Sequence, residues 1–172
     1  MQRSLFLKDT QLRVLKTMSE ATIRMDLNMF ANAVSLAPND AIIIIQQLTK
    51  EGYLQKIGTA YSLTEKGKSA LKMSMQVPED KNFCFYVDID KPLGFSARSI
   101  EEFYRIIKKI ISDSVEFHMY RGDFESWLCE VIGDKELAQD LLGIRTANVH
   151  GENLRKSLIK AFDSKYDIDE LR

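Results

Sequence analysis

Cysteine, proline and long apolar runs are all scarce in this 172-residue sequence. The two cysteines, Cys84 and Cys129, make no disulfide framework and match no metal-ligand spacing, so we expect buried free thiols. No apolar run is long enough to span a bilayer, and residues 1–10 lack the apolar core of a secretory signal. These absences predict a cytoplasmic protein with no membrane contact.

The motifs of common catalytic sites are also missing. The sequence has no Gly-rich phosphate loop, no serine nucleophile elbow and no paired-carboxylate motif. Its only two histidines, His118 and His150, are 32 residues apart and show no ligand spacing such as HxxxH. We therefore expect no enzyme, no metal and no cofactor.

What is present is ordinary globular composition, with 45% hydrophobic and 28% charged residues. The net charge of −1 hides an asymmetry between the two halves. Residues 1–75 carry ten Lys/Arg against six Asp/Glu (net +4), and residues 76–172 carry 14 against 19 (net −5). A basic first half suits contact with phosphates, and the acidic second half does not.

A break in the pattern divides the chain. Residues 76–82 contain Pro78 followed by charged residues, which makes them the best candidate for a linker. The sequence therefore predicts a first domain over residues 1–75 and a second over residues 83–172.

The clearest signal in the first domain lies in residues 36–67. An apolar stripe at helical spacing is followed by Gly52, which suits a helix C-terminus, and by two short alternating strands, 53–57 and 61–64. The stripe consists of Ala41, Ile44, Ile45 and Leu48. Two earlier helices, over residues 8–20 and around Met29, Phe30, Ala33 and Val34, and a later helix capped by Thr64 complete a winged helix-turn-helix.

The second domain is predicted to be mostly helical with one or two strands. Residues 83–89 form a β-rich run, residues 91–94 turn the chain, and Ser99 with Glu102 forms a capping box that opens a helix. Later helices are expected to begin at Asp123, at Asp134 and after Gly151, and the tail 163–172 is expected to fray. The predicted fold class is therefore α+β and mainly α.

Residues 1–75 resemble the winged-helix transcriptional regulators of archaea and bacteria, of the multiple-antibiotic-resistance and arsenical-resistance type. The resemblance is carried by residues 36–48, by Glu51-Gly-Tyr-Leu54 and by Tyr61-Ser-Leu-Thr-Glu-Lys-Gly67. It implies a DNA-binding fold that commonly works as a homodimer on a palindromic site.

Residues 83–165 resemble a small prokaryotic domain of unknown function. The matching positions are Pro92-Leu-Gly94, Ala97-Arg-Ser99 and, within residues 118–138, His118, Asp123, Phe124, Trp127, Gly133-Asp134 and Leu137-Ala138. The resemblance implies a domain boundary near residue 83 and no particular activity.

The outward face of the third helix is the candidate DNA contact. Ile43 points almost directly away from the apolar stripe, and polar residues surround it. Asn and Gln side chains pair with adenine, and an isoleucine contacts a thymine methyl. The predicted DNA-binding residues are Asn39, Asp40, Ile43, Gln46 and Gln47 for base edges, and Lys50 and Lys56 for phosphates.

The same helix also fits a different function. Asp40 repels phosphate, and no Arg or Lys occurs between Pro38 and Thr49, although cations supply most of the affinity for a duplex. Ile42 and Ile43 suit a dimer or protein-partner interface at least as well. The expected function is a transcriptional regulator whose second domain dimerises, senses a ligand or recruits a partner; the alternative is a protein-interaction adaptor.

His118, Arg121, Asp123 and Trp127 form a possible ligand-binding or structural polar site in the second domain. A histidine beside carboxylates suits a general base or a pH-sensitive hydrogen-bond partner. The structural alternative is that His118 bonds a backbone group or a cap and fixes a helix junction. Likewise Asp123 suits an N-cap, and Trp127 suits the core or a pocket wall.

Overall fold

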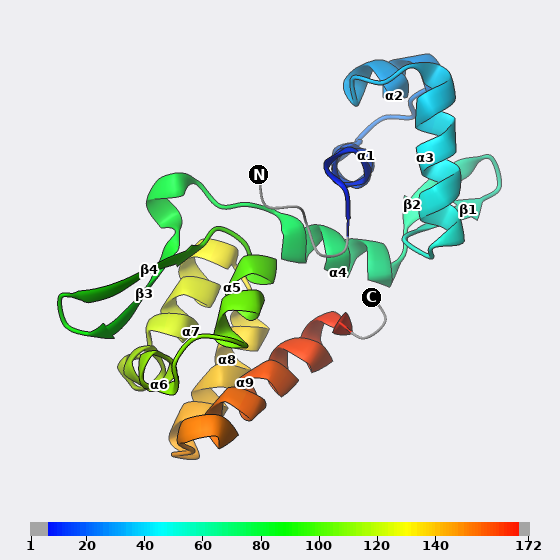
Figure 1. The fold of residues 1–172 in the computed structure, drawn as a ribbon. Coiled ribbons are helices and arrows are strands. Elements are labelled where there is room, and N and C mark those ends of the chain that lie inside the picture. Colours follow the sequence, from blue (N-terminus) through cyan, green and yellow to red (C-terminus); the bar gives the residue numbers. More distant parts are fainter. Residues whose placement is uncertain (1–6, 169–172) are drawn as a thin grey trace. The chain divides into compact units, whose positions relative to one another are not determined.

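The computed structural model describes residues 7–168, which form two compact units that divide between Ser74 and Met75 (Figure 1). Unit 1 comprises the described residues up to Ser74, and unit 2 begins at Met75. Helices dominate the described residues, and two small antiparallel sheets accompany them, so the fold is α+β and mainly α, as predicted. None of the helices within residues 7–168 has the length and apolar character needed to cross a membrane.

Unit 1 contains three helices, a β-hairpin and a fourth helix, in the predicted order. The elements are α1 (Asp9–Glu20), α2 (Leu27–Ala33), α3 (Pro38–Lys50), β1 (Leu54–Ile57), β2 (Ala60–Leu63) and α4 (Glu65–Ser74). The strands pair antiparallel with Leu54 opposite Leu63 and Ile57 opposite Ala60, so residues 58 and 59 form the tip.

The core of unit 1 forms where α1, α2 and the inner face of α3 meet. On α3 the side chains of Ala41, Ile45 and Leu48 are buried and Ile44 is half-buried, which matches the predicted stripe. The predicted second helix is present as α2, although of the residues that indicated it Met29 and Ala33 are exposed. The Asp26 carboxylate caps α2 by accepting from the Met29 amide at 2.9 Å, and the inward face then consists of Phe30, Ala31 and Val34.

Thr64 joins the end of α3 to the start of α4. Its hydroxyl accepts a hydrogen bond from the Gly67 amide at 3.1 Å, which confirms the predicted N-cap, and donates to the Gly52 carbonyl at 2.6 Å. Gly67 cannot be larger, because a Cβ atom there would lie 2.1 Å from the Tyr53 carbonyl oxygen. The helix, hairpin and following helix are therefore tied together at one point.

Unit 2 consists of a β-hairpin and a cluster of helices. The elements are a 3₁₀ turn η1 (Glu79–Lys81), β3 (Phe83–Asp88), β4 (Lys91–Ala97), α5 (Ile100–Ile107), α6 (Ser112–Arg121), α7 (Asp123–Trp127), a π-helical turn η2 (Leu128–Ile132), α8 (Lys135–Thr146) and α9 (Gly151–Tyr166). Strand β3 pairs antiparallel with β4 and lies beside α6.

The structure corrects the predicted turn at residues 91–94. The chain turns at Ile89 and Asp90, where Asp90 has a φ of 58°, and β4 begins at Lys91. Proline and glycine are unfavourable inside a central strand. Strand β4 tolerates Pro92 and Gly94 because a two-stranded sheet has only edge strands and because the register of this pair shifts along its length.

Two further boundaries differ from the prediction. Residues 76–82 belong to unit 2, since the Val77 amide donates to the Arg98 carbonyl at 2.7 Å and Trp127 Nε1 donates to the Lys81 carbonyl at 2.9 Å. The tail does not fray from residue 163, because α9 continues to Tyr166 and the side chains of Tyr166 and Ile168 are buried. Residues 169–172 of the predicted tail lie outside the described residues.

Aromatic rings fill the core of unit 2. The Phe103 ring stacks on Trp127 with centroids 5.3 Å apart and on Phe162 at 5.5 Å. The cysteines are free, as predicted, but neither is fully buried: Cys129 is half-buried, and Cys84 is exposed because it lies on the face of β3 opposite the buried Phe83 and Phe85. The rings hold the helices against β3, and this packing positions the polar residues of α6 and of the start of α7.

Helix caps in unit 2 follow the sequence at two of three positions. The Asp134 carboxylate accepts from the Leu137 amide at 3.1 Å, and the Ser99 hydroxyl accepts from the Glu102 amide at 3.1 Å. Glu102 reaches back to the Arg98 amide instead of the Ser99 amide. The predicted Asp123 cap is wrong: Gly122, with a φ of 77°, is the N-cap of α7, and the Asp123 carboxylate bonds elsewhere.

Candidate functional sites

The outer face of α3 carries polar side chains without internal partners. Asn39, Asp40, Gln46, Gln47 and Lys50 are exposed, and within residues 7–168 their side chains make no hydrogen bond or ion pair. Ile43 is 51% exposed among them, and Ile42 is half-buried on the flank. The structure therefore brings the helix residues of the predicted DNA contact onto one surface.

The β1–β2 hairpin carries one cation and holds a second at its tip. Lys56 is exposed, and its ammonium lies 5.9 Å from the centroid of the Tyr61 ring. Arg24, from the segment between α1 and α2, donates through Nη2 to the Thr59 hydroxyl at the hairpin tip, 2.9 Å away. Nothing local in the sequence indicates this contact, because 35 residues separate the two partners.

In unit 2, α6 satisfies both peptide groups of Tyr86 on strand β3. His118 Nε2 accepts from the Tyr86 amide at 2.8 Å, and the Ser114 hydroxyl donates to the Tyr86 carbonyl at 2.6 Å. Ser114 and His118 are four residues apart, so they project from the same face of the helix. Together they take the place of a third strand at this position.

The second ring nitrogen of His118 bonds the Asp123 carboxylate. Nδ1 lies 2.8 Å from Asp123 Oδ2, and because Nε2 accepts a hydrogen bond, Nδ1 must carry the proton of the neutral ring. Arg121 Nε donates to the same oxygen at 3.1 Å. Burial lowers the pKa of His118 below its ordinary value, against the hydrogen bond and charge of Asp123, which raise it. His118 is therefore neutral, and neither nitrogen is free to act as a base.

Arg121 and Trp127 have different surroundings. The Arg121 guanidinium lies 4.8 Å from the Phe117 ring centroid, and its side chain is 51% exposed. Trp127 is buried against Phe103 and holds the Lys81 carbonyl, so it is a core residue. The four residues of the predicted polar site thus divide into a linked group of three and one residue of the core.

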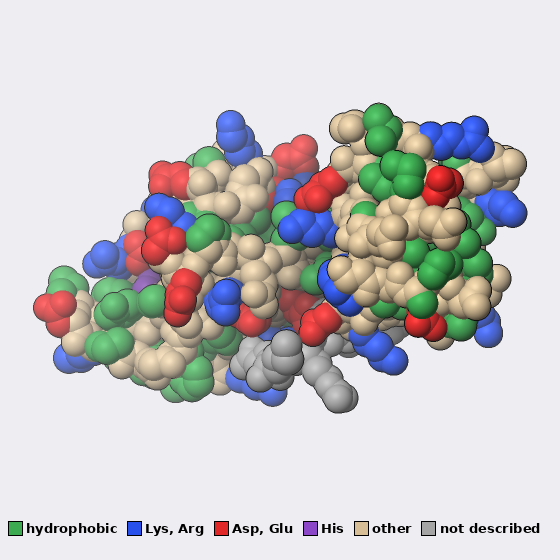
Figure 2. Space-filling model, turned by 90° about the horizontal axis from the view of Figure 1, so that it is seen from above, with side chains coloured by type: hydrophobic (Ala, Val, Ile, Leu, Met, Phe, Trp, Pro, Cys, Tyr) green, Lys and Arg blue, Asp and Glu red, His purple; other side chains and the backbone are tan. Residues whose placement is uncertain are grey.

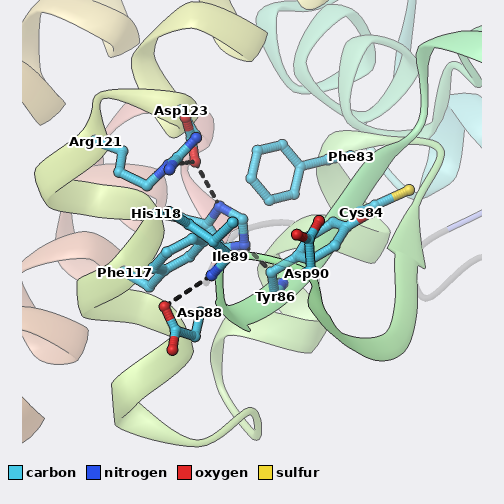
Figure 3. Close-up of a pocket in the computed structure, with 10 residues that line it drawn as sticks. All are labelled: Phe83, Cys84, Tyr86, Asp88, Ile89, Asp90, Phe117, His118, Arg121 and Asp123. Atoms are coloured by element: carbon cyan, nitrogen blue, oxygen red, sulfur yellow. Dashed lines mark hydrogen bonds and ion pairs between the residues drawn. The ribbon is translucent and has the colours of Figure 1, made fainter.

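A pocket of about 390 Å³ opens beside the linked group (Figure 3). Its residues come from β3, from the β3–β4 turn, from α6 and from the start of α7: Phe83, Cys84, Tyr86, Asp88, Ile89, Asp90, Phe117, His118, Arg121 and Asp123. The strand and turn residues were not predicted, because their approach to α6 depends on the tertiary fold. Within residues 7–168 no cluster of three or more His, Cys, Asp or Glu could hold a metal ion.

Glu125 on α7 and Arg145 on α8 form an ion pair that the sequence does not suggest. Glu125 Oε1 lies 3.0 Å from Arg145 Nε, and both carboxylate oxygens are inaccessible to solvent. Burial raises the pKa of Glu125. Arg145 also packs against Gly122, where a Cβ atom would lie 2.7 Å from its Nη1. This pair ties α8 to the junction between α6 and α7.

By its fold, this protein is a mainly helical α+β chain. Its second unit holds a His–Asp–Arg group beside a pocket. The chain belongs to a family of unknown function, DUF5752, whose sequence profile matches residues 80–171. The matched residues include the whole pocket and leave unit 1 outside. No curated protein and no solved structure matches the chain.

Proposed function

We propose that this protein is a DNA-binding transcriptional regulator that places α3 in the major groove of a duplex. Unit 1 then acts as a winged helix of the regulator type, and unit 2 dimerises, senses a ligand or recruits a partner. The observation that carries the proposal is the set of side-chain amides on the outer face of α3. Asn39, Gln46 and Gln47 are exposed and have no partner within residues 7–168.

Exposed amides on one face of a helix suit base recognition. An Asn or Gln amide both donates and accepts, which matches N6 and N7 of adenine, and Ile43 offers an apolar surface to a thymine methyl. Because Ala41, Ile45 and Leu48 are buried, the helix cannot rotate to hide these groups. The proposed site therefore favours A·T-rich half-sites.

The cations available for phosphates flank this face. Lys50 lies at the end of α3, Lys56 lies on the hairpin, and Arg24 is held at the hairpin tip by Thr59. Three cations per protomer contribute modest affinity, so a homodimer on two half-sites supplies the rest. The proposal places the protein in the cytoplasm and assigns it no catalytic step.

Duplex binding at several salt concentrations tests the proposal. We expect affinity to fall as salt rises, and Lys56→Ala to reduce the slope of log K against log salt by about 0.9 per protomer. Gln47→Ala should weaken a selected site by roughly 1–3 kcal/mol and leave random duplexes unaffected. Absence of salt-sensitive duplex binding at low ionic strength contradicts the proposal.

A second candidate function is an adaptor in which α3 contacts a protein. It is favoured by apolar exposure, since Ile43 on α3 and Ile57 at the end of β1 are 51% and 61% exposed. Figure 2 shows hydrophobic side chains on the visible surface, with charged side chains distributed between them. The double substitution Ile42→Lys and Ile43→Lys should then abolish a dimer or partner contact, whereas an unchanged oligomeric state and unchanged partner capture count against it.

A further inference from the structure

A chain of hydrogen bonds running from β3 to the pocket mouth orients the Arg121 guanidinium. The Tyr86 amide donates to His118 Nε2 at 2.8 Å, His118 Nδ1 donates to Asp123 at 2.8 Å, and Asp123 accepts from Arg121 Nε at 3.1 Å. The Phe117 ring supports the guanidinium from one side, 4.8 Å away. Figure 3 shows these groups in sequence along the pocket. The exposed Arg121 side chain is thus held in place by a hydrogen-bonded chain that runs through the buried His118.

The support leaves the outer end of Arg121 available. Only Nε is engaged, and within residues 7–168 its Nη1 and Nη2 atoms have no hydrogen-bond partner. These two nitrogens form a planar fork that matches a carboxylate in bidentate geometry. Arg121 is therefore presented for a carboxylate that comes from outside this unit.

The β3–β4 turn contributes a free carboxylate to the same pocket. Asp90 is exposed and has no partner within the described part of the chain. Its neighbour Asp88 is occupied, since it pairs with Lys91 at 2.8 Å and accepts from the Ile89 amide at 2.8 Å. The pocket thus has one available cationic fork and one available anion, supplied by different elements.

Part of the remaining wall is apolar, beside the engaged polar groups of Asp88, His118 and Asp123. Phe117 and Tyr86 contribute half-buried rings, and Ile89 in the turn is 68% exposed although it lines the pocket. An apolar group bound there would cover Ile89 and remove it from water. A volume of about 390 Å³ is in the range of small-molecule sites.

We propose that this pocket binds a free amino acid with an apolar side chain, with the carboxylate on Arg121 and the ammonium on Asp90. A simple anion would meet the unneutralised Asp90, and a simple cation would leave the two free nitrogens of Arg121 without an acceptor, whereas a zwitterion engages both groups. The proposal rests on the ligand-sensing role in the proposed function and names its ligand. Its test needs no DNA, so failure of ligand binding and failure of DNA binding are distinguishable.

Calorimetric titration of the full chain with three related probes tests it. L-phenylalanine carries both charges, phenethylamine lacks the carboxylate and 3-phenylpropionate lacks the ammonium. We expect saturable binding of L-phenylalanine, and also of L-leucine, with each single-charge analogue weaker by roughly tenfold or more.

Variants at the two ends of the pocket should change this preference in opposite ways. Arg121→Gln should remove the advantage of L-phenylalanine over phenethylamine, and Arg121→Lys should restore only part of it. Asp90→Asn should remove the advantage over 3-phenylpropionate. Glu130→Gln, at an exposed position of unit 2 outside the pocket, is the matched control and should bind like the wild type.

Three results would overturn the proposal, provided that Trp127 fluorescence shows unit 2 to be folded. They are absence of binding by both amino acids, equal binding of the three phenyl probes, and unchanged binding by Arg121→Gln. Equal loss of all probes in Arg121→Gln and Asp90→Asn would also contradict the assignment of one charge to each residue.

Discussion

His118 Nε2 accepts a hydrogen bond from the backbone amide of Tyr86, 2.8 Å away and 32 residues earlier in the chain. This contact fastens α6 to the edge of β3 and fixes which ring nitrogen holds the proton. Through Nδ1 and Asp123 it also sets the position of Arg121. One buried side chain therefore supports both the fold of unit 2 and its pocket.

Replacing His118 should destabilise unit 2. In His118→Phe the Tyr86 amide loses its acceptor, which costs about 1–3 kcal/mol, and the Asp123 carboxylate loses one of its two donors but keeps Arg121. His118→Gln keeps an acceptor and should lose less. Trp127 is the only tryptophan and lies in unit 2, so urea denaturation followed by its fluorescence measures this unit. Equal stability of both variants and the wild type would contradict the role of His118.

Acid should weaken unit 2 through the same residue. Burial lowers the pKa of His118 in the folded state below 6.5, so the unfolded chain takes up the proton first as pH falls. The stability that neutral His118 provides is complete above about pH 6.5 and declines below it, by up to about 1.36 kcal/mol per pH unit until the folded state also protonates.

Comparison with His118→Gln isolates this effect. Glu125 titrates in both proteins. Its pKa is raised in the folded state, so the stability that its protonated form contributes is lost as pH rises, which is opposite to the effect of His118. The difference in unfolding free energy between wild type and His118→Gln should therefore shrink as pH falls from 7 toward 5. A difference that is constant over this range would show that His118 does not titrate on unfolding.

Gly122 and Gly133 provide a matched pair of substitutions. Both have a positive φ, 77° and 80°, so alanine is strained at either position by about 1 kcal/mol. Only at Gly122 would the new Cβ atom meet Arg145, whose Nη1 lies 2.7 Å away. Gly122→Ala should therefore destabilise unit 2 more than Gly133→Ala, as measured by Trp127 fluorescence in urea. Equal losses would mean that Arg145 moves without cost.

Gly67→Ala should severely destabilise unit 1. The added Cβ atom would lie 2.1 Å from a backbone carbonyl, which no side-chain movement relieves. Gly143→Ala on α8 has open space around it and should instead be neutral or stabilising by up to about 1 kcal/mol. Scanning calorimetry of both variants checks the contrast, and an unshifted transition for Gly67→Ala would contradict it.

The sequence predicts those parts of this fold that depend on local spacing. The apolar stripe of α3, the Thr64 cap and the Asp134 cap all depend on residues within one or two helical turns. The sequence allows a second strand in unit 2 but does not locate β4, because Pro92 and Gly94 are typical of a turn and only the pairing with β3 makes these residues a strand.

The pocket could not be predicted for a similar reason. His118, Arg121 and Asp123 were recognised as a polar group from their closeness in sequence. Tyr86, which bonds His118, and Asp90, which lines the same pocket, come from a hairpin about 30 residues earlier, and nothing local in the sequence marks that approach. Asp123 was expected to cap a helix because its position fits, but the charges of Arg121 and the proton of His118 compete for the same carboxylate.

Selection of bound sequences from random duplex DNA tests the central claim, that the outer face of α3 reads DNA. The wild type should enrich a motif with A·T pairs in repeated half-sites. A variant with Asn39, Gln46 and Gln47 all changed to Ala should lose the motif but keep weak, salt-sensitive binding through its cations. Failure of the wild type to enrich any sequence, or enrichment of the same motif by the triple variant, would contradict the claim.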